Sequence, residues 1–138
     1  MDGRSFLEVA RELASGATEA HWRATAGRAY YALLLEARDL LDRWGLPRAS
    51  RDRAHHLARL RLIYSGDTDL RQAGYVCEQL GLLRNRADYD LSAHRDFQSA
   101  AQAIRAAAQA EAAIRQLDQI DADPARRAAA IASIPSLP

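Results

Sequence analysis

The residues best suited to chemistry lie together in one short polar segment, LRNRADY, at positions 83–89. It contains Arg84, Asn85, Arg86, Asp88 and Tyr89. A guanidinium group binds phosphate through paired N–H donors. A carboxylate four residues after an arginine can pair with it on the same face of a helix. The segment is therefore a candidate phosphate-binding site, with Arg84 and Asp88 at its centre.

A helix from about Leu70 to Tyr89, opened by Asp67 or Thr68, must position this segment. An advance of about 100° per residue puts its apolar residues on one side: Leu70, Ala73, Val76, Cys77, Leu80, Leu83 and Ala87. Arg84 falls in the middle of that side and Asp88 at its edge. A buried arginine needs a charged partner or a polar cavity. Two interpretations stay open: an Arg84–Asp88 ion pair that closes the core, or a crevice in which Arg84 receives a phosphate.

The opposite side of the same helix carries a second pattern. Tyr75, Leu82 and Tyr89 are seven residues apart and share a narrow apolar stripe. An apolar stripe that faces away from the core indicates a contact with another helix or a subunit interface. We expect either a fifth-helix contact or the interface of a homodimer.

Capping residues and apolar periodicity predict four further helices. Their expected N-caps are Ser5, Thr18, Ser50 and Ser92, and their expected ends lie near Ser15, Trp44, Ser65 and Ile120. Gly45 and Pro47 mark the end of the second helix. Short links make neighbouring helices antiparallel. The sequence thus predicts an all-α antiparallel bundle of four to five helices over residues 1–120, with a loosely ordered tail over 121–138.

The overall composition excludes several classes of protein. The 138 residues carry a net charge of +1, and every one of the 19 basic residues is arginine. Codon usage or phosphate recognition would each explain that bias. No apolar run approaches the roughly 20 residues of a membrane span, and the charged start lacks a signal-peptide core. We therefore expect a cytoplasmic protein with no membrane partner.

No cofactor or metal is expected from the motifs. The single cysteine, Cys77, is read as a small core residue, because no second cysteine offers a disulfide or metal-ligand spacing. The chain has no glycine-rich phosphate loop, no dinucleotide-binding fingerprint and no Glu-x-x-His pair. The predicted chemistry therefore depends on side chains alone.

Two segments together resemble a known family. Arg28-Ala29-Tyr30-Tyr31-Ala32 lies in the second helix, and Leu83–Tyr89 closes the fourth. In an all-helical chain of this length, this layout is similar to the HEPN family, in particular its small bacterial branch with "RAYYA" and "RxRADY" segments. The similarity runs from about Phe6 to Leu117. It implies a dimeric bundle, in many members a metal-independent endoribonuclease, found as a toxin beside a minimal nucleotidyltransferase antitoxin or within defence systems.

The resemblance also assigns roles to residues. Arg84 matches the family's arginine and Asn85 the polar residue after it. The family's histidine follows five to seven positions after the arginine, but here those positions hold Tyr89, Asp90 and Leu91. The nearest histidine is His94, ten positions after Arg84. We expect Arg84, Asp88 and His94 to form a catalytic group, and Asn85, Tyr89, Arg86, Arg28 and Tyr31 to contact RNA.

Some side chains keep two interpretations. Tyr30 and Tyr31 suit packing as well as a site. His55 and His56 point about 100° apart, so at most one of them lines the crevice and the other lies on the surface. The basic stretch that follows Pro47 suits a nucleic-acid backbone or a solvated helix face; it comprises Arg48, Arg51, Arg53, Arg59 and Arg61.

Two functions therefore remain open. The first is an RNA-directed protein of HEPN type, acting as a metal-independent endoribonuclease toxin of a toxin–antitoxin or defence module. The second is a non-catalytic bundle that partners a nucleotidyltransferase-like protein. The absence of a histidine at the family's position favours the second, because cleavage of RNA without a metal needs a group that titrates near neutrality.

Overall fold

The computed structural model describes residues 1–46 and 54–136. Its helices are α1 (Gly3–Ala14), α2 (Glu19–Arg43), α3 (Ala54–Ile63), α4 (Thr68–Tyr89), α5 (Ala100–Ala122) and α6 (Pro124–Ala132), with one 3-10 turn, η2 (Arg95–Phe97). No strand occurs within the described residues. The all-α prediction is confirmed, with six α-helices in the described part of the chain where four to five were predicted.

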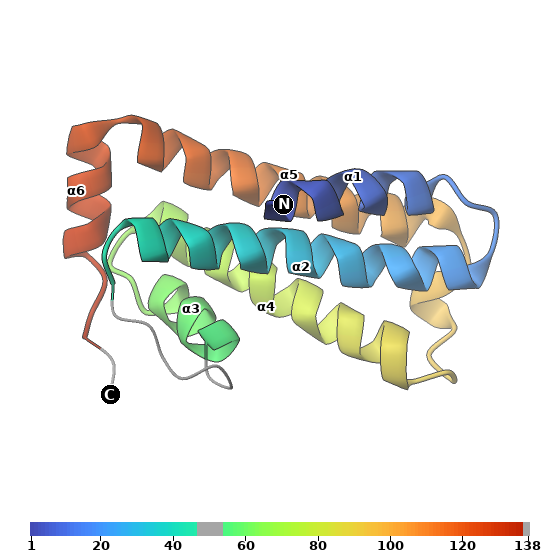
Figure 1. The fold of residues 1–138 in the computed structure, drawn as a ribbon. Helices are drawn as coiled ribbons and strands as arrows, with labels where there is room; N and C mark the ends of the chain where they lie inside the picture. Colours follow the sequence, from blue (N-terminus) through green and yellow to red (C-terminus); the bar gives the residue numbers. More distant parts are fainter. Residues whose placement is uncertain (47–53, 137–138) are drawn as a thin grey trace.

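The long helices α1, α2, α4 and α5 form the bundle (Figure 1). Each runs antiparallel to the next along the chain, and α2 crosses the front of the view between α1 and α4. The short helix α3 packs against α2 and α4. Helix α6 turns across the end of the bundle that holds the start of α4.

The predicted core side of α4 faces the interior. Leu70, Ala73, Cys77, Leu80, Leu83 and Ala87 are all buried, and Val76 is partly buried against the same core. Gly74 lets α3 approach closely, because a Cβ there would lie 2.9 Å from the Leu62 Cβ. Burial raises the pKa of the Cys77 thiol to about 12, which suits the predicted role as a core residue.

Three predicted helix ends are confirmed. Thr18 accepts a hydrogen bond from the His21 N–H at the start of α2. Of the two residues predicted to open α4, Asp67 is the N-cap and accepts from the Asp69 and Leu70 N–H groups, and Thr68 is the first helical residue. Gly45 has φ of +78° just after α2, a backbone conformation that favours glycine.

Two predicted N-caps are wrong. Asp2 caps α1 by accepting from the Ser5 N–H, so the N-cap lies three residues before the predicted one, Ser5. Ser92 bonds to the Asp90 carboxylate instead, and α5 begins after Ser99, whose hydroxyl accepts from the Ala101 N–H. In both cases a second acceptor close in sequence takes the capping role.

The segment expected to be a loosely ordered tail contains α6. Asp123 caps this helix, and Pro124 occupies its first turn. Arg126 forms an ion pair with Asp67 at the start of α4. The Gly66 N–H donates to the Ser133 carbonyl at 2.9 Å. These contacts attach α6 to the turn between α3 and α4.

The predicted third N-cap, Ser50, and Arg48, Arg51 and Arg53 lie outside the described residues. Among the helices of the described part, none is long and apolar enough to cross a membrane.

Candidate functional site

Arg84 lies five residues before the end of α4, and its side chain is 22% exposed. Its Nε lies 2.9 Å from the Asp88 Oδ2. The Nε–H does not point at that oxygen, so the contact is an ion pair without an aligned hydrogen bond. Its Nη1 donates to the Asn85 Oδ1 at 3.3 Å. The predicted Arg84–Asp88 pair is therefore present, with the guanidinium at the edge of the core.

Arginine and aromatic side chains alternate across α1, α2 and α4. The Arg28 guanidinium carbon lies 5.2 Å from the ring centre of Phe6 and 6.0 Å from that of Tyr31. The Arg84 guanidinium carbon lies 5.4 Å from the Tyr31 ring centre and 5.3 Å from the Tyr89 ring centre. These distances are within the range of cation–π contacts. We call Phe6, Arg28, Tyr31, Arg84 and Tyr89 the arginine–aromatic row.

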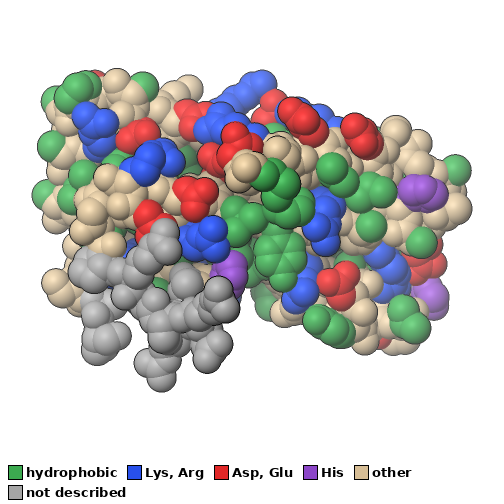
Figure 2. Space-filling model, in the orientation of Figure 1, with side chains coloured by type: hydrophobic (Ala, Val, Ile, Leu, Met, Phe, Trp, Pro, Cys, Tyr) green, Lys and Arg blue, Asp and Glu red, His purple; other side chains and the backbone are tan. Residues whose placement is uncertain are grey.

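The row brings the two segments of the family resemblance together. Arg28 and Tyr31 come from the first segment, and Arg84 and Tyr89 from the second. Arg28 has no carboxylate partner among the described residues. Figure 2 shows apolar side chains gathered near the middle of the front face, with basic side chains at their edges. The row therefore offers cations and rings on one surface.

A cavity of about 190 Å³ lies beside the row, between α2, α3 and α4. Its lining residues are Tyr30, Tyr31, Leu34, His55, Arg59, Glu78, Gly81, Leu82, Arg84 and Asn85. His55 thus lines the same cavity as Arg84, and His56 does not. Both histidines are exposed, and His56 Nδ1 lies 2.9 Å from a guanidinium nitrogen of Arg59. Arg59 has no ion-pair partner among the described residues, although Glu78 lines the same cavity.

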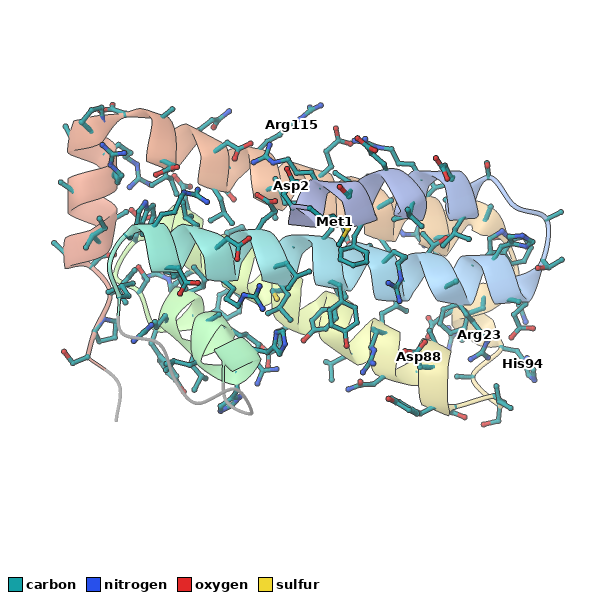
Figure 3. The ribbon with its side chains drawn as sticks, viewed as in Figure 1. Met1, Asp2, Arg23, Asp88, His94 and Arg115 are labelled. Atoms are coloured by element: carbon teal, nitrogen blue, oxygen red, sulfur yellow. The ribbon has the colours of Figure 1, made fainter. Side chains whose placement is uncertain are left out.

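His94 lies elsewhere. Its side chain is 64% exposed, and its Nδ1 lies 3.1 Å from the Glu19 Oε1 at the start of α2. Arg84 instead faces Gly27. Gly27 lies eight residues after Glu19 on α2, a separation of about 12 Å along the helix axis at 1.5 Å per residue. In Figure 3, His94 lies in the loop after α4, beside Arg23. The structure does not bring His94 into contact with Arg84.

Arg86 also points away from the row. Its Nε donates to the Asp96 Oδ2 at 2.9 Å, which ties the end of α4 to η2. Of the eight residues expected at the site, the structure groups Arg28, Tyr31, Arg84, Asn85, Asp88 and Tyr89, and it places Arg86 and His94 in the loop contacts beyond α4.

Arg23, which is 8% exposed, was not among the residues predicted to matter. Its Nη1 donates to the carbonyls of Arg86, Ala87 and Asp90, and its guanidinium lies over the Phe97 ring. The carbonyls of Arg86 and Asp90 also accept backbone N–H groups, from Asp90 and Ala93. The buried Ala87 carbonyl is one of the last four of α4, which lack the usual partner within a helix, and Arg23 supplies its hydrogen bond. Arg23 also bonds Glu19 and, ahead of His94, lowers the pKa of that carboxyl. The sequence feature that could have predicted the burial of Arg23 is its position three residues before Ala26, on the same apolar side of α2.

The apolar stripe on α4 is uncovered. Tyr75 is 48% exposed, Leu82 49% and Tyr89 74%. The expectation of a fifth-helix contact is therefore wrong, because α5 packs on the core side of α4, and the interface interpretation stays a prediction.

Comparison with known proteins gave no match to a family model, to a curated protein or to a solved structure. Within the described ranges, no group of three or more histidine, cysteine or acidic side chains is placed to hold a metal ion.

Proposed function

We propose that this protein binds single-stranded RNA along the arginine–aromatic row and is a HEPN-type RNA-directed protein. The observation that carries the proposal is the alternation of Arg28 and Arg84 with Phe6, Tyr31 and Tyr89 beside a cavity that holds a further arginine. Proteins that bind single strands combine cations along the phosphates with aromatic rings on which bases stack.

The charges along the row support binding of a polyanion. Arg28 and Arg59 have no carboxylate partner among the described residues, so both are available to phosphates. Tyr89 exposes most of its surface and offers a ring to a base. Each phosphate neutralised by such a cation releases counterions, and the affinity then falls as salt is added.

Metal-independent cleavage is the second part of this proposal. Arg84 would stabilise the negative charge of the pentavalent phosphorane. Tyr75 and Leu82 of the exposed stripe would form the interface of a homodimer. Tyr89, the most exposed residue of the stripe, would remain open to RNA at the edge of that interface. In this proposal the protein is a cytoplasmic toxin of a toxin–antitoxin or defence module, with a minimal nucleotidyltransferase as antitoxin.

One observation favours a different function. The Arg84 guanidinium is already paired with Asp88, and His94 is paired with Glu19 at the loop end of the bundle. Both contacts suit a non-catalytic bundle whose partner is a nucleotidyltransferase-like protein. Under this second proposal the polar segment serves stability, and RNA is not a ligand.

The test is binding of a fluorescein-labelled single-stranded RNA in EDTA, followed by anisotropy over a series of salt concentrations. We expect Arg28→Gln to weaken binding about 10-fold and to reduce the salt slope by about 0.7, the value for one phosphate contact on a single strand. Arg115→Gln is the matched control: it removes the same charge from α5, at the edge of the bundle away from Asp88 (Figure 3).

Two results would contradict the proposal. One is a folded wild-type protein that does not bind RNA, which would favour the interaction module. The other is an equal loss of affinity in Arg28→Gln and Arg115→Gln, which would show that net charge alone holds the RNA.

A further inference from the structure

The cavity beside the row contains a histidine at a position that the family pattern does not use. His55 and Arg59 are four residues apart on α3, and both line the cavity together with Arg84. Residues four apart share one face of a helix. We propose that His55, and not His94, is the acid–base residue for RNA cleavage at Arg84. This inference rests on the proposed RNA-directed function.

The surroundings of His55 suit a group that must accept a proton. Partial burial, and then the charge of Arg38, lower the pKa of His55, so the ring is neutral at neutral pH although one side remains open to solvent. Arg59 on α3 and Arg84 on α4 add positive charge across the cavity, and Tyr30 lines it from α2. Glu78 is the single carboxylate among the described lining residues. Glu78 would favour the imidazolium once the ring has taken a proton.

The size of the cavity limits what it can hold. At about 190 Å³ it is smaller than the roughly 300–1,000 Å³ typical of small-molecule sites. A single phosphate with its ribose, as one part of an RNA strand, fits that space better than a complete small-molecule ligand. The bases on either side would then lie outside the cavity, where Tyr31 and Tyr89 provide rings along the row.

The step is a transesterification within the RNA. The unprotonated nitrogen of His55 removes the proton of the 2′-hydroxyl group, and O2′ attacks the phosphorus held by Arg84 and Arg59. The bond from phosphorus to O5′ breaks, leaving a 2′,3′-cyclic phosphate and a 5′-oxygen that takes a proton from water. The imidazolium returns its proton to water. No electron is transferred and no metal is needed.

The experiment measures cleavage and binding separately. Cleavage of a long single-stranded RNA is followed in EDTA, and affinity is measured with a 2′-O-methylated strand that cannot react. We expect His55→Gln to slow cleavage at least about 100-fold, the usual scale of general acid–base catalysis, with affinity unchanged within about 3-fold. His21→Gln, an exposed histidine of α2 that contacts Thr18, is the control and should cleave at the wild-type rate.

The rate should also fall on acidification in the wild-type protein, because protonated His55 cannot accept a proton. The lowered pKa of His55 places this fall at a more acidic pH than for an ordinary histidine. The inference is overturned if His55→Gln cleaves as fast as the wild type, if His94→Gln alone abolishes cleavage, or if the wild type binds the methylated strand but cleaves no RNA. Failure of the wild type to bind that strand would instead overturn the proposed function, and this inference with it.

Discussion

Replacement of Arg23 by methionine should destabilise the protein by about 3 kcal/mol. The side chain is almost fully buried, and it bonds three carbonyls at the end of α4 at 2.9–3.1 Å. Methionine keeps most of the length and the apolar stem of arginine but has no donor. The substitution therefore tests the hydrogen bonds and the charge with little change in packed volume.

The magnitude follows from which carbonyls lose access to water. The Ala87 carbonyl is buried, and leaving it unpaired costs about 1–3 kcal/mol. The carbonyls of Arg86 and Asp90 are only partly buried, so water would replace Arg23 there at little cost. The cation–π contact with Phe97 contributes about 1 kcal/mol more. Arg23→Lys keeps the charge but has fewer donors, and should lose about half as much.

Urea unfolding followed by circular dichroism measures the loss. With a slope of about 2 kcal/mol per molar urea, the midpoint of Arg23→Met should fall by about 1.5 M. Arg115 is an exposed arginine whose one ion-pair partner among the described residues is Glu111, and Arg115→Met should change stability by less than about 0.5 kcal/mol. A midpoint shift for Arg23→Met no larger than that of Arg115→Met would refute the capping role.

Two further predictions concern the contacts of α3, α4 and α6. The hydrogen bond from Arg126 is the largest cause of the lowered pKa of Asp67. The ionised Asp67 carboxylate therefore stabilises the folded protein fully above the pKa of the unfolded chain, near 3.8, and this stabilisation is lost as the pH falls through the lower pKa of the folded protein. Asp67→Asn should thus flatten the acid dependence of the free energy of unfolding below about pH 4, and equal acid slopes in urea titrations would contradict this. Gly74→Ala should destabilise by about 1–3 kcal/mol, because its Cβ would lie 2.9 Å from the Leu62 Cβ. Gly66→Ala is the control, because a Cβ there would meet the Ser133 Cβ at 3.6 Å and the Ser133 carbonyl oxygen at 3.8 Å, both ordinary contacts. An equal fall in the thermal midpoints of the two variants would count against the clash at Gly74.

Local patterns were enough to predict much of the fold. Every apolar residue assigned to the core side of α4 is at least partly buried, because a period of 3.6 leaves one face to the interior. Thr18 and Asp67 were found as caps because a capping side chain bonds only two or three residues away. The prediction that Ser92 is an N-cap was wrong for the same local reason. Asp90 lies two residues before Ser92, and its carboxylate accepts hydrogen bonds from the Ser92 hydroxyl and N–H.

The position of His94 could not be predicted in this way. The loop after α4 is shaped by Arg23, whose guanidinium bonds the Asp90 and Ala93 carbonyls from 67 and 70 residues earlier in the chain. No local pattern contains that contact. The spacing from Arg84 to His94 therefore says nothing about the distance between them, and the same holds for His55, which reaches the cavity from a separate helix.

Arg84 was interpreted either as the partner of Asp88 in an ion pair or as the group that receives a phosphate, and the structure is compatible with both roles. The Asp88 carboxylate and the rings of Tyr31 and Tyr89 fix the Arg84 guanidinium in place. A fixed group costs little entropy when a phosphate arrives, but the phosphate must then compete with Asp88. Arg28 has no such competitor among the described residues. Arg28 should therefore supply more of the affinity for RNA, and Arg84 more of the orientation at the cavity.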